Sequence, residues 1–356
     1  MNTILDLYTD YLMTTTSKAT CTGLSKVLDN AYSHDSFTRL LSGSNFDSKF
    51  LWQEGKVYVR ELSSSNILKV LVLDDSLQEK LWTDESELVC WHFDHSKQRS
   101  IKGVNFMSSL LVCDDVSIPV GVEFVKKDLW ATNAKTGKPQ RKSSKSKNQL
   151  FREMVNNAND RMAIDYISAD SWYSSSENLD YLHNDLGSKF VIALKSNRKI
   201  AISKEAKFAG QYLGIESLEL KDAPVQVWLK ELDFPLLLHK QVFKNGDDVV
   251  GDIYLVSNDL SLSAEQITTI YKKRWKVEEY HKSLKQNAAF GKSPTGTTKT
   301  QTNHFMASVL AFIKFEALKL KHQQNHFSLK AKIMMAANKA ALITLRDLTQ
   351  NIKNAA

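Results

Sequence analysis

The chain has few cysteines, no long apolar run and no signal for export. Only three cysteines occur among 356 residues, and none of them forms a Cys-x-x-Cys pair. A disulfide framework is therefore not expected, which predicts a reducing compartment, the cytoplasm. The longest mainly apolar run, residues 306–313, is far too short to span a bilayer, so no membrane partner is expected. The first residues contain acids and lack the basic start of a signal peptide.

The sequence also lacks the Gly-x4-Gly-Lys-Ser/Thr loop that cradles phosphates, so use of ATP is not implied. It does have an ordinary globular composition, with 42% hydrophobic and 24% charged residues, and a formal net charge of +7. An excess of positive charge favours an anionic partner, and nucleic acid is the commonest one. The length is sufficient for two or three domains.

The first part of the chain is expected to be helical. Residues 1–62 carry apolar residues at helical spacing, and we expect them to form a DNA-binding region. Within them, residues 20–43 have the pattern of two helices around a polar turn, with Asp35 or Ser36 as the cap of the second helix. This pattern fits a DNA-reading unit, and it equally fits a plain helical hairpin.

Strand patterns follow. Residues 67–125 contain apolar runs joined by short turns, which is typical of antiparallel strands. Residues 149–194 alternate between helix and strand, which predicts parallel pairing. The predicted fold is therefore α/β, a mixed sheet with a β-rich insertion, flanked by N- and C-terminal helical regions. The predicted parts are the core at 63–198, the insertion at 199–258, the return to the core at 259–298 and the C-terminal helices at 299–356.

Residues 131–148 are rich in cations and contain no acid. This composition predicts a flexible loop. Its charge suits contacts with phosphates, which gain affinity through counterion release, although a solvated linker would have the same composition. The cations are Lys135, Lys138, Arg141, Lys142, Lys145 and Lys147.

Carboxylates follow two of the apolar strand patterns. Asp74 and Asp75 end the run KVLVL, and Asp170 ends the run YISA. A carboxylate at the end of a buried strand is unfavourable unless something neutralises it. If the strands are neighbours and a helix adds Glu278, the three clustered acids would hold divalent cations through their oxygens. The intervals between these acids fit a ribonuclease-H-like sheet with an insertion before its last helix. Taken singly, each aspartate also fits a strand-end turn or a helix cap.

The segment 271–285 combines an aromatic residue, two cations and a carboxylate. Tyr271, Arg274, Glu278 and Lys285 are spaced by three, four and seven residues, which places them near one face of a helix. Such a face suits a polyanion backbone, with the carboxylate left for a metal ion. A solvated charged helix is the alternative.

These motifs resemble those of DDE transposases, and in particular the bacterial insertion-sequence family with the Tyr-Arg-Glu-Lys signature, family four. The signature Y-x2-R-x3-E-x6-K matches without a gap, and ISADSWYSS and VLVLDDSLQEK are similar to the regions of the two aspartates. The resemblance extends over residues 65–320. It implies a ribonuclease-H-like fold and a transposase that cleaves the ends of its element and transfers them to target DNA.

The resemblance implies that Asp74, Asp170 and Glu278 are catalytic and hold two Mg²⁺ ions, with Mn²⁺ as a possible substitute. The choice between the adjacent aspartates stays open. The run Asp74-Asp75-Ser76 fits the family pattern with Asp74 as the catalytic acid. Adjacent residues of a strand point to opposite faces, so only one of the two can face the metals.

The resemblance also implies the partners. Tyr271, Arg274 and Lys285 would bind phosphates and bases at the transposon end, and Trp275 either flips a base or belongs to the core. The implied DNA is double-stranded, both the terminal inverted repeats and the target, and the C-terminal helices would support a homodimer in the DNA complex. A bacterial, nucleoid-associated location follows from this reading.

Three alternatives stay open. One is a ribonuclease-H-like nuclease that cuts without strand transfer, and another is a non-catalytic DNA-binding protein derived from a transposase. The third is a separate zinc site, which the C-x-H-x2-H pattern of Cys90, His92 and His95 suggests. Zinc needs four ligands and no fourth is evident, which favours a simple cluster at a strand end.

Overall fold

A computed structural model describes residues 3–63, 67–94, 97–134, 136–218, 220, 223–245 and 248–355. The chain divides into two compact units. One unit, Gly55–Glu279, holds the strands, and the other combines Met1–Glu54 with Tyr280–Ala356. The finer five-part division predicted above stays a prediction. No helix in the described ranges is long and apolar enough to cross a membrane.

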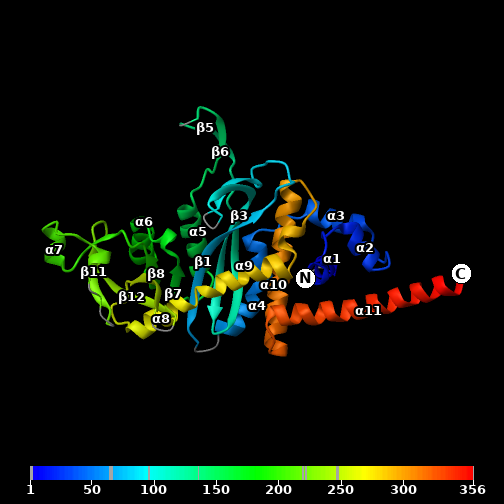
Figure 1. Cartoon of the computed structure of the whole chain (residues 1–356). Coiled ribbons are helices and arrows are strands. Elements are labelled where there is room, and N and C mark those ends of the chain that lie inside the picture. Colours follow the sequence, from blue (N-terminus) through cyan, green and yellow to red (C-terminus); the bar gives the residue numbers. More distant parts are fainter. Residues whose placement is uncertain are drawn as a thin grey trace. The chain divides into compact units, whose positions relative to one another are not determined.

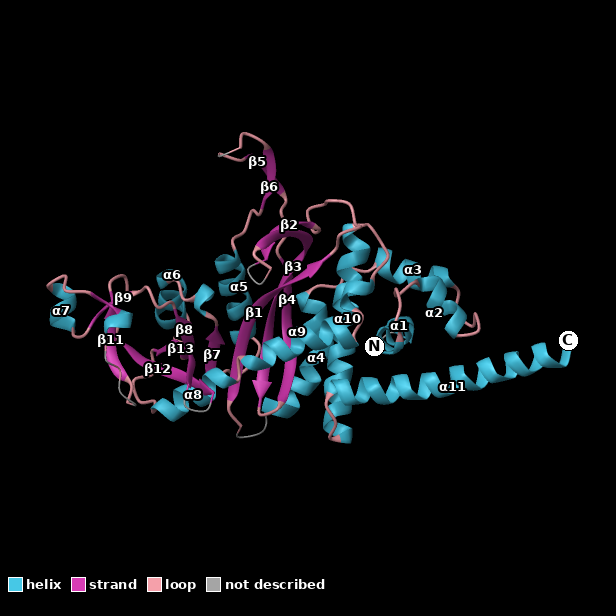
Figure 2. Cartoon of the chain, viewed as in Figure 1, coloured by secondary structure: helices cyan, strands magenta, loops and turns pink. Residues whose placement is uncertain are grey.

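The centre of the first unit is a mixed sheet (Figures 1 and 2). Strands β3 and β4 run antiparallel to their neighbours, and β7 and β8 run parallel to β1, in the order β4-β3-β1-β7-β8. Three antiparallel strands followed by two parallel ones are the ribonuclease-H-like order, so the predicted fold class is confirmed. The strands are β1 (Lys69–Glu79), β3 (Arg99–Cys113), β4 (Val116–Phe124), β7 (Tyr166–Ala169) and β8 (Phe190–Leu194).

Burial explains why these runs become central strands. The first six residues of β1 and all five of β8 are buried, as expected of strands covered on both faces. Helix α5 (Lys147–Asn159) packs against β3 and β4, and α8 (Ala264–Lys272) packs against β7 and β8. Between β7 and β8 lie a short 3-10 turn, Ser171–Tyr173, helix α6 (Ser176–Asp180) and a π-helical turn, Tyr181–Asp185.

The β-rich segment continues the same sheet beyond β8. Strand β13 pairs antiparallel with β8, and the order outward is β13-β12-β11-β9-β10. The turn predicted between β12 and β13 lies partly outside the described residues. The elements are β9 (Lys199–Ala201), α7 (Lys204–Phe208), β10 (Leu213–Gly214), a 3-10 turn (Ile215–Ser217), β11 (Val225–Leu229), β12 (Leu236–Asn245) and β13 (Asp248–Ser257).

The prediction of a flexible loop at 131–148 is wrong for its first half. Strands β5 (Leu129–Thr132) and β6 (Pro139–Lys142) pair as a separate two-stranded hairpin. Trp130 pairs with Arg141, and the guanidinium lies 4.5 Å from the centre of the indole ring. This cation–π contact stabilises a pairing that composition does not reveal. A further short strand, β2 (Cys90–Asp94), pairs with β3.

The second unit is helical. Helices α1 and α3 pack against α10. Asn303 of α10 donates to the carbonyls of Leu41 (2.7 Å) and Ser44 (2.8 Å) at the end of α3, and the Tyr8 hydroxyl of α1 hydrogen-bonds with His304 Nδ1 at 2.8 Å. Two helices, α4 and α9, run across the boundary between the units. The helices are α1 (Thr3–Thr14), α2 (Cys21–Val27), α3 (His34–Gly43), α4 (Ser48–Ser63), α9 (Trp275–Asn287), the 3-10 turn Phe290–Lys292, α10 (Thr298–His322) and α11 (His326–Ala355).

The predicted cap of the second short helix is wrong by two or three residues. Helix α3 begins at His34, within the polar break, so Ser33 occupies the cap position. Its hydroxyl hydrogen-bonds with the hydroxyl of Ser36 at 3.4 Å and does not accept from a backbone N–H of the helix. Asp35 instead lies in the first turn, where the helix dipole favours a negative charge.

Candidate active site

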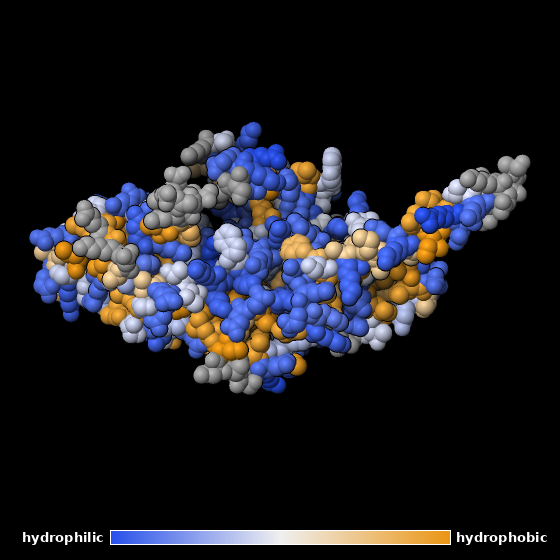
Figure 3. Space-filling view, turned by 60° about the horizontal axis from the view of Figure 1, so that its bottom comes forward, coloured by the Kyte–Doolittle hydropathy of each residue, from blue (hydrophilic) through white to orange (hydrophobic). Residues whose placement is uncertain are grey.

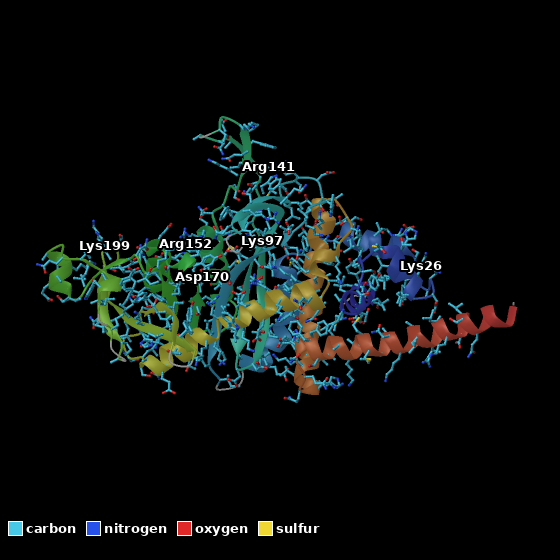
Figure 4. The ribbon with its side chains drawn as sticks, in the orientation of Figure 1. Lys26, Lys97, Arg141, Arg152, Asp170 and Lys199 are labelled. Atoms are coloured by element: carbon cyan, nitrogen blue, oxygen red, sulfur yellow. The ribbon has the colours of Figure 1, made fainter. Side chains whose placement is uncertain are left out.

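The first two acids lie on neighbouring strands, Asp74 in the middle of β1 and Asp170 directly after β7. The expectation that β1 ends at Asp74 is wrong, because its pairing with β3 continues to Glu79. Strands β1 and β7 are parallel, and Leu73 pairs with Ala169, so Asp74 and Asp170 follow in the same register. Asp74 is buried, with 8% of its surface exposed, whereas Asp170 is partly exposed. Figure 4 shows Asp170 on the ribbon after β7. The backbone N–H of Trp172 donates to the Asp170 carboxylate at 2.8 Å, which orients it.

The third acid comes from the start of α9. One carboxylate oxygen of Glu278 lies within 4.8 Å of one of Asp74. The guanidinium Nη1 of Arg274 lies between them, 3.6 Å from Asp74 Oδ2 and 3.7 Å from Glu278 Oε1. The Glu278 side chain is 48% exposed, so the cluster is open on this side. His281, one turn further along α9, belongs to the other unit.

The electrostatics of the cluster favour the uptake of a cation. Burial, and then the neighbouring charges of Asp170 and Asp75, raise the pKa of Asp74 to about 8, although Arg274 acts in the opposite direction. Burial also raises the pKa of Asp170. One guanidinium therefore does not neutralise the acids, and oxygen donors at this spacing fit a hard divalent cation.

Asp75 points away from this cluster into a set of donors. Its Oδ2 accepts from Lys147 Nζ (2.6 Å) and Asn105 Nδ2 (3.0 Å), and its Oδ1 accepts from the Tyr173 hydroxyl (2.7 Å). Burial opposes its ionisation, but Lys147 and these hydrogen bonds outweigh burial and lower the pKa of Asp75. Its oxygens are already satisfied, which leaves Asp74 as the member of the pair that faces the other acids.

The signature segment is not one continuous helix, contrary to the expectation. Helix α8 ends at Lys272 and α9 begins at Trp275. Between the two helices the chain forms a tight turn, in which the backbone N–H of Arg274 donates to the carbonyl of Tyr271, three residues back. This turn brings the Arg274 guanidinium to 5.6 Å from the centre of the Tyr271 ring.

The signature residues differ in exposure. Tyr271 is buried, and burial raises its pKa to about 12. Trp275 is 63% exposed, which excludes the alternative that it belongs to the core of its unit. Lys285 lies in the other unit, so the structure does not relate it to the acids.

The basic residues of 131–148 fall into two groups. Lys138 and Lys142 are exposed and form no ion pair within the described ranges. Arg141 and Lys145 pair with acids of their own surroundings, Glu85 at 3.6 Å and Glu153 at 2.8 Å. Lys135 lies outside the described residues.

Sequence reasoning missed the supports of Asp75. Asn105, Lys147 and Tyr173 come from β3, the start of α5 and the turn after Asp170. Only the position of Tyr173, three residues after Asp170, gives any local signal. A smaller cluster joins Cys90 Sγ and His92 Nε2 at 3.2 Å, both buried. His95 lies outside the described residues, and no group of three metal ligands includes this pair in the described part of the chain.

Comparisons with known proteins show a family for this chain. The family model described as DDE superfamily endonuclease matches residues 2–211, and that described as Transposase DDE domain matches residues 140–313. No curated protein matches the chain significantly. Among solved structures, the Drosophila P element transposase strand transfer complex matches with 14% identity and a TM-score of 0.24. That match covers 53% of this chain, and the chain spans only 37% of the P element protein.

Proposed function

Because the chain belongs to the DDE superfamily endonuclease family, we propose that it is a DNA transposase of the insertion-sequence family with the Tyr-Arg-Glu-Lys signature. The observation that supports this proposal is the position of Arg274 between Asp74 and Glu278, with Asp170 on the neighbouring strand in register with Asp74. Residues 63–198 and 259–298 form the catalytic core in this proposal, with 199–258 as its insertion.

In this proposal, Asp74, Asp170 and Glu278 hold two Mg²⁺ ions, which Mn²⁺ can replace. When bound, the ions supply activation of the attacking oxygen and stabilisation of the leaving oxygen of a phosphodiester. Arg274 offsets the charge of Asp74 and Glu278. The bonds from Lys147 and Tyr173 to Asp75 hold the middle of β1, the start of α5 and the turn after Asp170 together.

The proposed reaction has two in-line displacements at phosphorus. Water attacks the phosphodiester at the end of the element, which breaks the bond to the 3′ oxygen and frees a 3′-hydroxyl. That hydroxyl then attacks a phosphodiester of the target DNA and displaces its 3′ oxygen. Both steps develop charge at the same positions, so the same carboxylates serve both.

The DNA contacts are assigned by chemistry. Tyr271, Arg274 and Lys285 bind the end of the element, and the exposed indole of Trp275 offers a stacking surface for a flipped base. The basic residues Lys138, Arg141, Lys142 and Lys145 contact phosphates. Residues 1–62 read the terminal inverted repeats in this scheme.

We propose a homodimer because of the spacing of residues along α11. Phe327, Ala331, Met334, Asn338, Ala341, Leu345 and Leu348 repeat at alternating steps of four and three. This is the spacing of the residues that form the seam of a coiled coil, in which a single Asn fixes register and strand number. From Met335 to Gln350 every residue of α11 is exposed, and Figure 3 shows apolar side chains along it. A second copy of α11 is the partner that this repeat fits.

The decisive experiment compares Asp170→Asn and Glu278→Gln with the wild type. Both variants should bind a duplex with the element's end normally and fail to cleave it in Mg²⁺. A pre-cut end and a target plasmid then separate transposition from simple nuclease activity, because only a transposase joins the two. Magnesium-dependent cleavage of any DNA by the wild type would exclude the non-catalytic alternative.

A further inference from the structure

A groove of two adjoining hollows begins next to Asp170. The inner hollow, of about 530 Å³, is lined by Ser171, by residues 194–197 at the end of β8 and by residues 252–254 of β13. The outer hollow, of about 660 Å³, starts at Lys195 and Asn197 and reaches Lys230. The two hollows share Lys195 and Asn197 in their linings, so they adjoin, and we call them together the side groove. Figure 4 shows Lys199, which lines its outer hollow, on the side of Asp170 toward the outer strands.

The side groove is positively charged. Lys195, Arg198, Lys199 and Lys230 line the outer hollow, against the single acid Glu231. In the described part of the chain, the amino groups of the three lysines form no ion pair. Cations that lack a partner in the protein are suited to an anionic ligand.

The acid of the inner hollow is already neutralised. Asp252 pairs with Lys240 at 2.7 Å, so it adds little negative charge to the groove. The remaining lining of the inner hollow is uncharged apart from Lys195. The net charge along the side groove therefore favours a chain of phosphates.

Arg198 is fixed in place by the loop that follows Asp170. Its Nη2 donates to the carbonyl of Ser174 at 3.2 Å and to the hydroxyl of Ser176 at 3.0 Å. Its Nε is buried and has no hydrogen-bond partner among the described residues. A guanidinium held in this way has lost little freedom, and its Nη1 remains to donate to a phosphate.

Aromatic side chains accompany the cations. Tyr212 lines the outer hollow, and Tyr254 lines the inner one. Cations interleaved with aromatic rings are typical of sites for single-stranded nucleic acid, where phosphates meet the charges and bases stack on the rings. Hollows of this volume accept ligands of drug size, comparable with one or two nucleotides, and are too small for a duplex.

We propose that the side groove binds single-stranded DNA that adjoins the scissile phosphate. This inference rests on the proposed function for its choice of DNA as the polyanion. It adds a path that leads away from Asp170 across the end of β8, with Arg198 as a fixed phosphate contact and Tyr212 as a stacking surface.

The test measures binding of a fluorescent single-stranded oligonucleotide in EDTA, where cleavage cannot occur. The double variant Lys199→Gln/Lys230→Gln should weaken binding and lower the salt slope by about 1.4, or about 0.7 for each phosphate contact. Tyr212→Leu should weaken it about five-fold or more by loss of stacking. The matched control is Lys332→Gln/Lys339→Gln, which removes the same charge from exposed positions of α11 and should leave the slope unchanged.

An equal salt slope for the groove variant and the control variant would overturn the proposal, as would a preference of the groove for duplex over single strands. Circular dichroism of each variant confirms that it is folded. Failure of the proposed function is separate, because it appears as a lack of cleavage in Mg²⁺. A protein that binds the oligonucleotide through the groove without cleaving DNA would keep this inference and lose the transposase proposal.

Discussion

At the residue scale, the adjacent Asp74 and Asp75 have opposite surroundings. Asp74 faces other acids and has a raised pKa, whereas Asp75 is held by Lys147, Asn105 and Tyr173 and has a lowered one. The reason is the alternation of a strand, which turns neighbouring side chains to opposite faces. The pair therefore combines one acid that suits a metal with one that stabilises the fold around it.

Substitution should separate the two roles. We expect Asp74→Asn to remain folded and to lose cleavage. Asp75→Asn leaves Lys147 without its charged partner, so it should lose about 1–3 kcal/mol of unfolding free energy and retain part of its activity. Urea unfolding and a cleavage assay check both expectations. If Asp75→Asn had normal stability and no cleavage activity while Asp74→Asn stayed active, Asp75 and not Asp74 would be the catalytic acid.

The raised pKa of Asp74 also predicts a pH dependence of stability without metal. Between its ordinary value of 3.8 and about 8, the folded protein keeps a proton that the unfolded chain has released. The unfolding free energy therefore falls as pH rises from about 4 to about 8 and levels off above that. Asp74→Asn lacks this ionisation, so in EDTA its unfolding free energy relative to that of the wild type should increase as pH rises from about 4 to about 8. Urea titrations at both ends measure the difference, and an equal difference at both ends contradicts the prediction.

At the scale of elements, the turn between α8 and α9 decides which signature residues act together. It places Arg274 against Asp74 and Glu278, while Lys276 bonds to Asp115 at 2.5 Å and to Glu279 at 2.8 Å. Lys276 thus anchors the start of α9 to the turn between β3 and β4.

Arg274→Lys keeps the charge but cannot form two parallel hydrogen bonds with a phosphate. We expect it to impair cleavage and strand transfer more than the initial binding of DNA. The control is Lys272→Gln, since Lys272 is exposed and forms no ion pair in the described part of the chain. Time courses for each step provide the measurement. If both variants lost activity equally, general charge and not the guanidinium would explain the segment.

A second prediction at this scale is that the hairpin β5–β6 contacts duplex DNA. Lys138→Gln/Lys142→Gln removes two exposed charges, so the salt slope of duplex binding should fall by about 1.8, at about 0.9 for each phosphate contact. Lys145→Gln should change the slope less, because Lys145 already pairs with Glu153. Filter binding over a range of salt concentrations measures the slopes. An unchanged slope in the double variant would show that the hairpin does not touch DNA.

At the scale of the whole molecule, the exposed seam of α11 predicts self-association. Leu345 and Leu348 are 59% and 58% exposed, so charged residues there should not disturb the fold of one chain. Leu345→Lys/Leu348→Lys should convert dimers to monomers in sedimentation. Ile343→Lys, on the outer side of the same helix, is the control and should leave the dimer intact. Equal effects of the two variants would exclude the seam as the interface.

The sequence by itself determined the α/β class, the runs that became the central strands and the residue types of the site. These follow from local patterns, because a buried strand needs a continuous apolar run and a signature motif has a fixed spacing. The order β4-β3-β1-β7-β8 agrees with what the spacing of the acids implied. The residue types alone also showed that Asp74 and Asp75 were both candidates for the first catalytic acid, but they did not show which of the two faces the metals.

Only the tertiary structure decided how these parts meet. The partner of Asp75 is Lys147, 72 positions away, and no local pattern relates them. The pairing of Trp130 with Arg141 turned a segment of loop-like composition into a hairpin. The side groove joins the turn after Asp170 to residues of the inserted strands. Such contacts depend on strand register and on packing between distant segments, so no local sequence pattern predicts them.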